Sequence, residues 1–195
     1  MKHIIQLTAA LTLSGCAALS PSEPTTSQDA FFRSLSELCG KAFNGKLVST
    51  DEADADLAEQ PMVMHVRMCT ENEIHIPFHV GDDRSRTWVI SKQATGLRLK
   101  HDHRHQDGSE DAVTQYGGDT DDAGRVTRQS FPVDAFSIEL FEREGLTASV
   151  VNVWSVEVED GLFAYELTRP GRLFRVEFDT LLPVTPPPAP WGHEK

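Results

Sequence analysis

Histidine is concentrated at three alternate positions of the chain, His101, His103 and His105. Imidazole nitrogens bind zinc, copper and iron, and alternate residues of a strand lie about 7 Å apart, so one ion can take two of the three rings. A metal site here would use His101 and His103, together with a carboxylate from a neighbouring strand or loop. The alternative is a polar end of a sheet, where the histidines hydrogen-bond to aspartate or to water.

The element that must position these histidines is a predicted strand at residues 97–105. Side chains alternate along a strand, so the three histidines share a face with Leu97 and Leu99. If the leucines point into the core, the histidines continue the inner face toward one end of the sheet.

Positive charge is also concentrated around this strand, although the chain has a net charge of −12. The acidic balance argues against a nucleic-acid partner and against a basic membrane-binding patch. The cations could capture an anion, but we expect ordinary pairing with Glu157, Glu177 or Asp179 on adjacent strands. The cationic residues are Arg84, Arg86, Arg98, Lys100 and Arg104.

Alternating hydrophobicity with regularly spaced turns predicts a mainly β protein. We expect about nine strands in an antiparallel up-and-down barrel or barrel-like sheet. The predicted strands are 62–69, 73–80, 86–92, 97–105, 112–116, 125–131, 148–158, 162–168 and 173–178.

Two helices are expected beside the strands. The first has Ser27 or Asp29 as its N-cap, carries apolar residues at helical spacing as far as Phe43, and ends at Gly40 or Gly45. The second is inserted late in the chain, with Asp134 as its N-cap and Gly145 just past its end.

The first residues have the layout of a secretory signal, a short charged start followed by an apolar run too short to span a bilayer. Leu13-Ser14-Gly15-Cys16 resembles the lipobox of bacterial lipoproteins. The resemblance implies that Cys16 is lipidated and becomes the mature N-terminus, anchored by acyl chains in the outer membrane and facing the periplasm. The alternative is an ordinary signal cut near Ala17.

Three cysteines are an odd number for an exported protein. If Cys16 carries lipid, Cys39 and Cys69 remain as a pair, and an oxidising periplasm favours a disulfide between them. Two buried free thiols are the alternative.

The sequence divides into a signal peptide at 1–15, a lipidated tether at 16–27, a single β-rich domain at 28–182 and a proline-rich tail at 183–195. We expect Trp191 near the end of the tail to pack back on the domain. A ligand motif for a partner protein is the alternative.

The strand pattern resembles the calycin group of barrels, which includes the lipocalins. The stretches 78–88 and 97–105 are also similar to uncharacterised exported proteobacterial proteins, a similarity that implies no activity.

No motif of a serine hydrolase, phosphate-binding loop, dinucleotide site or zinc protease occurs, so the sequence favours a non-enzymatic function. We expect a lipid-anchored envelope protein that holds a small apolar or amphipathic ligand or has an accessory role, with no required cofactor. The alternatives are a metal-dependent site that uses zinc, copper or iron at His101 and His103, and a structural adaptor without a pocket. A barrel interior filled by aromatic residues would favour the adaptor, and a cavity of several hundred Å3 would favour the carrier.

Overall fold

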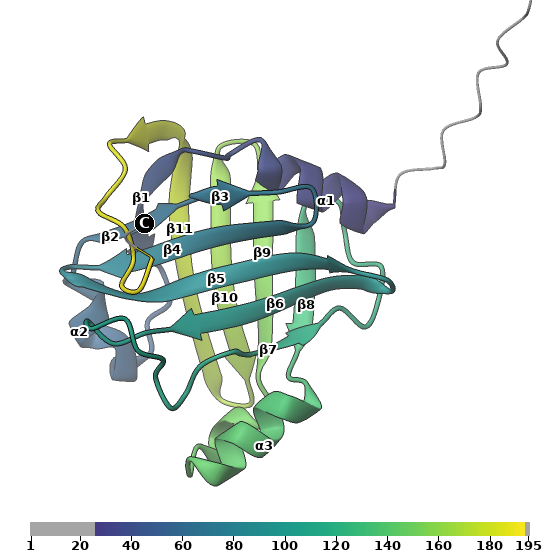
Figure 1. Cartoon of the computed structure of the whole chain (residues 1–195), viewed down its shortest axis with the longest axis vertical. Coiled ribbons are helices and arrows are strands. Elements are labelled where there is room, and N and C mark those ends of the chain that lie inside the picture. Colours follow the sequence, from purple (N-terminus) through teal and green to yellow (C-terminus); the bar gives the residue numbers. More distant parts are fainter. Residues whose placement is uncertain (1–25, 194–195) are drawn as a thin grey trace, which may run out of the picture.

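The computed structural model describes residues 26–193 and is dominated by one antiparallel sheet that curls into a nearly closed barrel. The lipobox and Cys16 lie outside the described residues. In Figure 1, β4–β6 run across the front of β9–β11, so the two halves of the sheet enclose the core between them. This architecture confirms the predicted β class and is consistent with a calycin-like barrel.

Ten strands follow one another around the barrel in the order β7-β6-β5-β4-β2-β1-β11-β10-β9-β8, and β3 pairs with β4 only. Nearly every strand therefore lies beside a strand that adjoins it in sequence, as in an up-and-down meander. The strands are β1 (Ala42–Leu47), β2 (Met62–His65), β3 (Met68–Cys69), β4 (Glu73–Val80), β5 (Asp83–Gln93), β6 (Gly96–His103), β7 (Tyr116–Asp119), β8 (Arg128–Pro132), β9 (Val153–Glu159), β10 (Leu162–Arg169) and β11 (Arg172–Val184).

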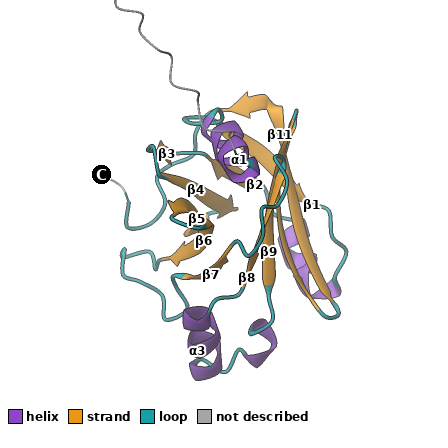
Figure 2. Ribbon diagram, turned by 90° about the vertical axis from the view of Figure 1, so that its right-hand side faces the viewer, coloured by secondary structure: helices purple, strands orange, loops and turns teal. Residues whose placement is uncertain are grey.

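The helices lie at the edges and ends of the barrel (Figure 2). None of the helices between residues 26 and 193 has the length and hydropathy of a membrane span. They are α1 (Ser27–Ser36), the 3-10 turn η1 (Glu52–Asp54), α2 (Ala55–Ala58), α3 (Ala135–Arg143) and the 3-10 turn η2 (Thr147–Ser149).

Helix α1 begins one residue earlier than the predicted caps allow. Thr26 is the N-cap, and its hydroxyl accepts a hydrogen bond from the backbone N–H of Asp29 in a capping box. Phe31, Phe32 and Leu35 are fully or almost fully buried, so the helix closes one end of the barrel with its apolar face.

The predicted first helix is wrong beyond Ser36. The chain turns at Gly40, which has a φ of +79°, and Ala42 and Phe43 then enter β1 between β2 and β11. Both side chains are completely buried there. Their spacing suits one face of a helix as well as a strand, and pairing with both neighbouring strands decides between the two.

Several other boundaries differ from the prediction. The strand expected at 148–158 begins only at Val153, after the 3-10 turn η2, and the strand expected at 125–131 begins at Arg128. The expected strand at 62–69 is interrupted into β2 and β3, which both pair with β4. Strand β7 begins at Tyr116, where the prediction had ended one. Strand β11 extends to Val184 because its far end pairs with Ala42 and Phe43 of β1, which the prediction had placed in the helix.

The barrel closes between β7 and β8 through the residues that begin α3, and the two strands are not paired with each other. The hydroxyl of Ser137, at the start of α3, accepts from the N–H of Gly117 at 2.7 Å, and the N–H of Asp134 donates to the carbonyl of Gly117 at 3.0 Å. A side chain at Gly118 would collide with the carbonyl of Pro132 on β8, so glycine is needed for this approach. The predicted cap of α3 is confirmed, because Asp134 accepts from the N–H of Ser137 at 2.8 Å.

Candidate functional site

The barrel interior is filled with side chains over most of its length and is hollow at the end opposite α1. The fully buried filling includes Phe43, Phe131, Trp154, Phe163 and Phe178. The remaining hollow has a volume of about 160 Å3. An apolar cavity of about 150 Å3 is enough to hold a benzene molecule. The hollow therefore suits a ligand of one ring or a similar short chain.

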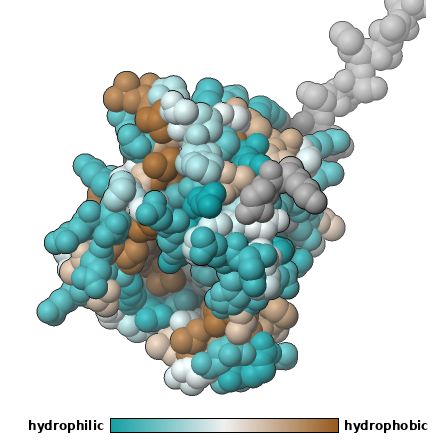
Figure 3. All heavy atoms as spheres, turned by 60° about the vertical axis from the view of Figure 1, so that its left-hand side comes forward, coloured by the Kyte–Doolittle hydropathy of each residue, from teal (hydrophilic) through white to brown (hydrophobic). Residues whose placement is uncertain are grey.

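Side chains from both halves of the barrel line the hollow, so it lies inside the sheet. Figure 3 turns the side of the molecule that carries α2 toward the viewer, and hydrophobic residues are recessed there between hydrophilic ones. The lining residues are Leu57, Phe78, Val80, Arg86, Trp88, His101, His103, Tyr116, Tyr165, Leu167 and Phe174.

Helix α2 is fixed at this end of the barrel by an ion pair. Arg172, the first residue of β11, donates to both carboxylate oxygens of Asp54, at 2.5 and 2.6 Å. Asp54 is only 4% exposed, and a buried bidentate pair of this kind holds its two segments in a fixed orientation. Leu57 of α2 is thereby held against the hollow.

Stacked aromatic rings form one wall of the hollow. The ring of Trp88 stacks on that of Tyr165 with centroids 4.4 Å apart and on that of Phe78 at 4.8 Å. Phe174 meets Tyr165 edge to face at 6.3 Å. These rings are held by several neighbours, so the wall is rigid and offers a flat apolar surface.

His101 sits at the base of the hollow and is 2% exposed. Its Nδ1 lies 3.1 Å from the backbone carbonyl of Tyr116, which can only accept, so Nδ1 carries the proton. Its Nε2 therefore accepts from the hydroxyl of Tyr165 at 2.8 Å. Burial, and secondarily the neighbouring His103, lowers the pKa of His101 to about 3, and the ring is neutral at physiological pH.

His103 lies two residues after His101 on β6, nearer the opening of the hollow. Its Nε2 lies 3.2 Å from the hydroxyl of Tyr116, whose own ring stacks on His101 with centroids 4.4 Å apart. Burial, followed by the charge of Arg86, lowers the pKa of His103 to about 4. Burial also raises the pKa of the Tyr116 hydroxyl, so the phenol stays protonated and can donate to a ligand.

Arg86 alone among the lining residues carries a permanent charge. One of its Nη atoms donates to the carboxylate of Asp83 at 2.6 Å. The expected ion pairing of the cationic residues is found for Arg86, Arg98, Lys100 and Arg104, but the predicted partners Glu157, Glu177 and Asp179 are wrong. The partners are Asp83, Asp119, Asp134 and Asp102. Glu157 and Glu177 bind Arg175 on the outer face of β9–β11, at 2.9 and 2.8 Å. Arg86 thus presents a partly neutralised guanidinium at the opening.

The prediction that His101, His103 and His105 share the inner face of the sheet is correct for His101 and His103 and wrong for His105. His101 and His103 lie on the inner face with Leu97 and Leu99, but β6 ends at His103 and the backbone then turns. The side chain of His105 is 57% exposed, and its Nε2 lies 3.9 Å from a carboxylate oxygen of Asp111. The alternation rule fails for His105 because it applies only while the strand continues.

The described residues contain no group of three histidine, cysteine, aspartate or glutamate side chains arranged to hold a metal ion. The ring centroids of His101 and His103 are 6.4 Å apart, and Tyr165 occupies the one lone pair that His101 offers. A metal ion at His101 would have to displace that hydroxyl.

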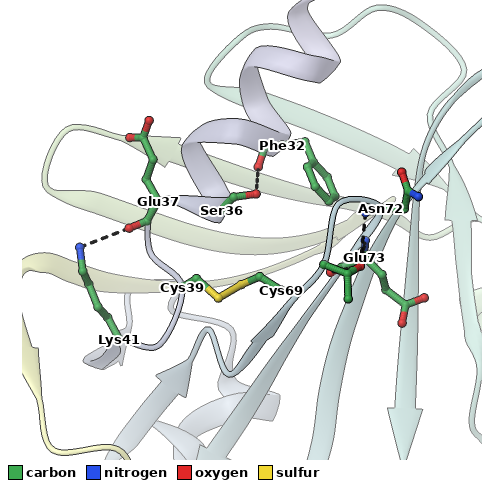
Figure 4. The surroundings of a disulfide bond; sticks show 9 residues. Phe32, Ser36, Glu37, Cys39, Lys41, Cys69, Asn72 and Glu73 are labelled. Atoms are coloured by element: carbon green, nitrogen blue, oxygen red, sulfur yellow. Dashed lines mark hydrogen bonds between the residues drawn. A yellow bond between two sulfur atoms is a disulfide. The ribbon is translucent and has the colours of Figure 1, made fainter.

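The predicted disulfide is present between Cys39 and Cys69, with their Cα atoms 6.2 Å apart. It joins the turn after α1 to β3 (Figure 4). The bond lies at the closed end of the barrel, so it stabilises the scaffold and takes no part in the hollow.

Comparison with known proteins yields no family model, curated protein or solved structure that matches this chain.

Sequence reasoning missed the aromatic wall of the hollow. Trp88 and Tyr165 were inside correctly predicted strands, and their alternation with neighbouring residues places both on the inner face. What the alternation does not reveal is that residues so far apart in sequence stack on each other, because that depends on how the barrel closes.

Proposed function

We propose that this protein is a lipid-anchored component of the bacterial cell envelope whose barrel binds a small amphipathic ligand. By size alone the aromatic filling and the hollow of about 160 Å3 favour the adaptor, because a carrier was expected to have several hundred Å3. The observation that carries the binding role is instead the lining of the hollow, an aromatic wall with a polar rim. A flat apolar surface beside a few hydrogen-bonding groups is the usual composition of a small-molecule site.

The size of the hollow limits the ligand. Long acyl chains and multi-ring lipids need several hundred Å3, so we propose a ligand of about one ring that carries a polar or anionic group. The apolar part would lie on Trp88 and Tyr165, and the polar group would face Arg86, His103 and the hydroxyl of Tyr116.

The lipobox supports the envelope location, and the disulfide agrees with an oxidising compartment. The membrane partner would be reached through the acyl chains on Cys16. A metal-dependent role at His101 and His103 and an adaptor role without a ligand remain the competing hypotheses.

Nuclear magnetic resonance titration of the protein with benzoate, phenol and benzylamine tests the binding role. We expect benzoate or phenol to bind and to shift the signals of the Trp88 indole and the His103 ring. Leu167→Trp places a large side chain in the hollow and should abolish the shifts of Trp88 and His103, while Trp191→Ala, outside the barrel, should leave these two shifts unchanged. Unchanged Trp88 and His103 shifts in the Leu167→Trp variant, or no shift with any probe in the wild type, would refute the proposal.

Native mass spectrometry of protein purified from its own cell envelope, with metal analysis of the same sample, separates the three hypotheses. A bound organic molecule of small mass supports the carrier, stoichiometric zinc, copper or iron supports the metal role, and the bare mass of the chain supports the adaptor.

A further inference from the structure

The C-terminal tail is bound to the outer face of the barrel, as the sequence predicts for Trp191. In Figure 1 the tail leaves the end of β11 and folds down over β4 and β5. The N–H of Trp191 donates to the carbonyl of Arg84 at 3.1 Å, and the Arg84 guanidinium donates to the carbonyl of Ala189 at 3.0 Å. His193 closes the attachment, with its Nε2 2.8 Å from a carboxylate oxygen of the buried Asp102.

A second hollow, of about 450 Å3, lies between this tail and the barrel. It is larger than the hollow inside the barrel and falls within the range of ordinary small-molecule sites. Its walls are mainly apolar. Pro61 and Val63 form the barrel side, and Pro187, Pro188 and Trp191 form the tail side.

A β-bulge turns the side chain of Arg84 toward this hollow. Phe78 pairs with Arg86 and Val80 pairs with Asp83, so His79 alone opposes Arg84 and Ser85. An extra residue of this kind turns a side chain out of the regular alternation. Arg84 lines the outer hollow, whereas Arg86, two residues along the same strand, lines the inner one.

Arg84 has capacity for a further partner. Within residues 26–193, its side chain has one hydrogen bond, to Ala189, and no carboxylate within ion-pair distance. A half-buried guanidinium with no carboxylate partner among residues 26–193 is unusual in a chain of charge −12, and its planar array of N–H donors matches a carboxylate group.

His79 supplies a second polar group to the same hollow. Its side chain faces outward, yet it is 4% exposed, and its Nε2 has no hydrogen-bond partner. The indole Nε1 of Trp191 is also buried without a partner. Unpaired buried polar atoms cost free energy, and an oxygen-rich ligand group held nearby would offset that cost.

From these contacts we propose that the tail and the outer face of β2, β4 and β5 form a binding site for a flat aromatic monocarboxylate. The carboxylate pairs with Arg84 beside His79, and the ring body lies between Trp191 and the prolines on one side and Val63 on the other. Asp82 and Gln106 lie on the rim. The charge of Asp82 disfavours a ligand with a second negative group.

Isothermal titration of the full chain with 2-naphthoate tests this site, because a two-ring anion is too large for the hollow inside the barrel. We expect one molecule to bind per chain, and the neutral 2-naphthamide to bind about tenfold more weakly. Arg84→Gln keeps an N–H donor for the carbonyl of Ala189 but removes the charge, and it should weaken naphthoate binding about tenfold and abolish the preference over the amide.

Three further variants locate the binding. Trp191→Ala should weaken naphthoate binding. Asp82→Asn should strengthen it about two- to fivefold, because the substitution removes a like charge. Arg86→Gln, inside the barrel, should leave naphthoate binding unchanged. No binding at millimolar naphthoate, equal binding of the amide, or a loss in Arg86→Gln but not in Arg84→Gln would overturn the proposal.

Discussion

The imidazole of His101 and the hydroxyl of Tyr165 share a hydrogen bond of 2.8 Å that joins β6 to β10 across the barrel interior. The second ring nitrogen of His101 is bound to the backbone of β7. One neutral side chain therefore links three strands, and both of its contacts require that the ring carry a single proton.

This arrangement predicts that the domain loses stability in mild acid. The pKa of His101 is about 3 in the folded protein and about 6.5 in an unfolded chain, so the unfolded state binds more protons below pH 6.5. The stabilisation is complete above pH 6.5 and is lost as the pH falls toward 3. We expect a loss of about 2 kcal/mol from this group between pH 6.5 and 5, measured by urea denaturation.

His79 and His103, whose pKa values are both lowered to about 4, act in the same direction. His101→Gln should flatten the pH profile, while His105→Gln, at an exposed position, should not. A wild-type stability that is constant from pH 7 to 5 would contradict this account.

The closure of the barrel predicts a large effect for a small substitution. Ser137→Ala leaves the buried N–H of Gly117 without its partner at 2.7 Å, and we expect a loss of about 1–3 kcal/mol of unfolding free energy. Ser109→Ala removes an exposed hydroxyl that bonds Asp107 and should cost less than about 0.5 kcal/mol. Equal effects of the two substitutions would show that Ser137 does not hold the seam.

The metal hypothesis is tested by thermal melts with added zinc or copper. An ion that binds only the folded state stabilises it by about 2.7 kcal/mol at a hundredfold excess over Kd. We expect no such rise, because the lone pair of His101 is held by Tyr165. A saturable rise in the wild type that disappears in both His101→Ala and His103→Ala would make these residues the functional site.

The disulfide should contribute substantially to stability. It closes a sequence separation of 30 residues, and removal through Cys39→Ala with Cys69→Ala should cost about 3–4 kcal/mol in urea denaturation. Reducing agent should destabilise the wild type by a similar amount and leave the double variant unchanged. Alkylation of both thiols in exported, unreduced protein would argue against the bond.

Membrane anchoring depends on Cys16, which precedes the described residues. Cys16→Ala should abolish incorporation of labelled palmitate and release the protein from the membrane fraction. The Cys39→Ala, Cys69→Ala double variant retains Cys16 and should still be labelled. A Cys16→Ala protein that stays with membranes after a salt wash would exclude the lipoprotein proposal.

Local sequence rules were sufficient wherever the physical cause is local. The alternation of apolar residues predicted most strands, and Asp134 and Gly145 marked the ends of α3 through a side-chain cap and a φ of +75°. The expectation that Cys16 carries lipid left Cys39 and Cys69 as the one possible pair, and the disulfide between them is present.

Only the tertiary structure decided features that depend on distant neighbours. Ala42 and Phe43 became a strand because β2 and β11 offered backbone partners on both sides. Strand β6 ended at His103 because the chain folds back there, with the N–H of Asp111 bonded to the carbonyl of His103 and the N–H of His105 bonded to the carbonyl of Ser109. His79 faces outward from β4, and it is buried because the C-terminal tail folds over that face. Both hollows arise in the same way, since each is the space that remains between segments far apart in the chain.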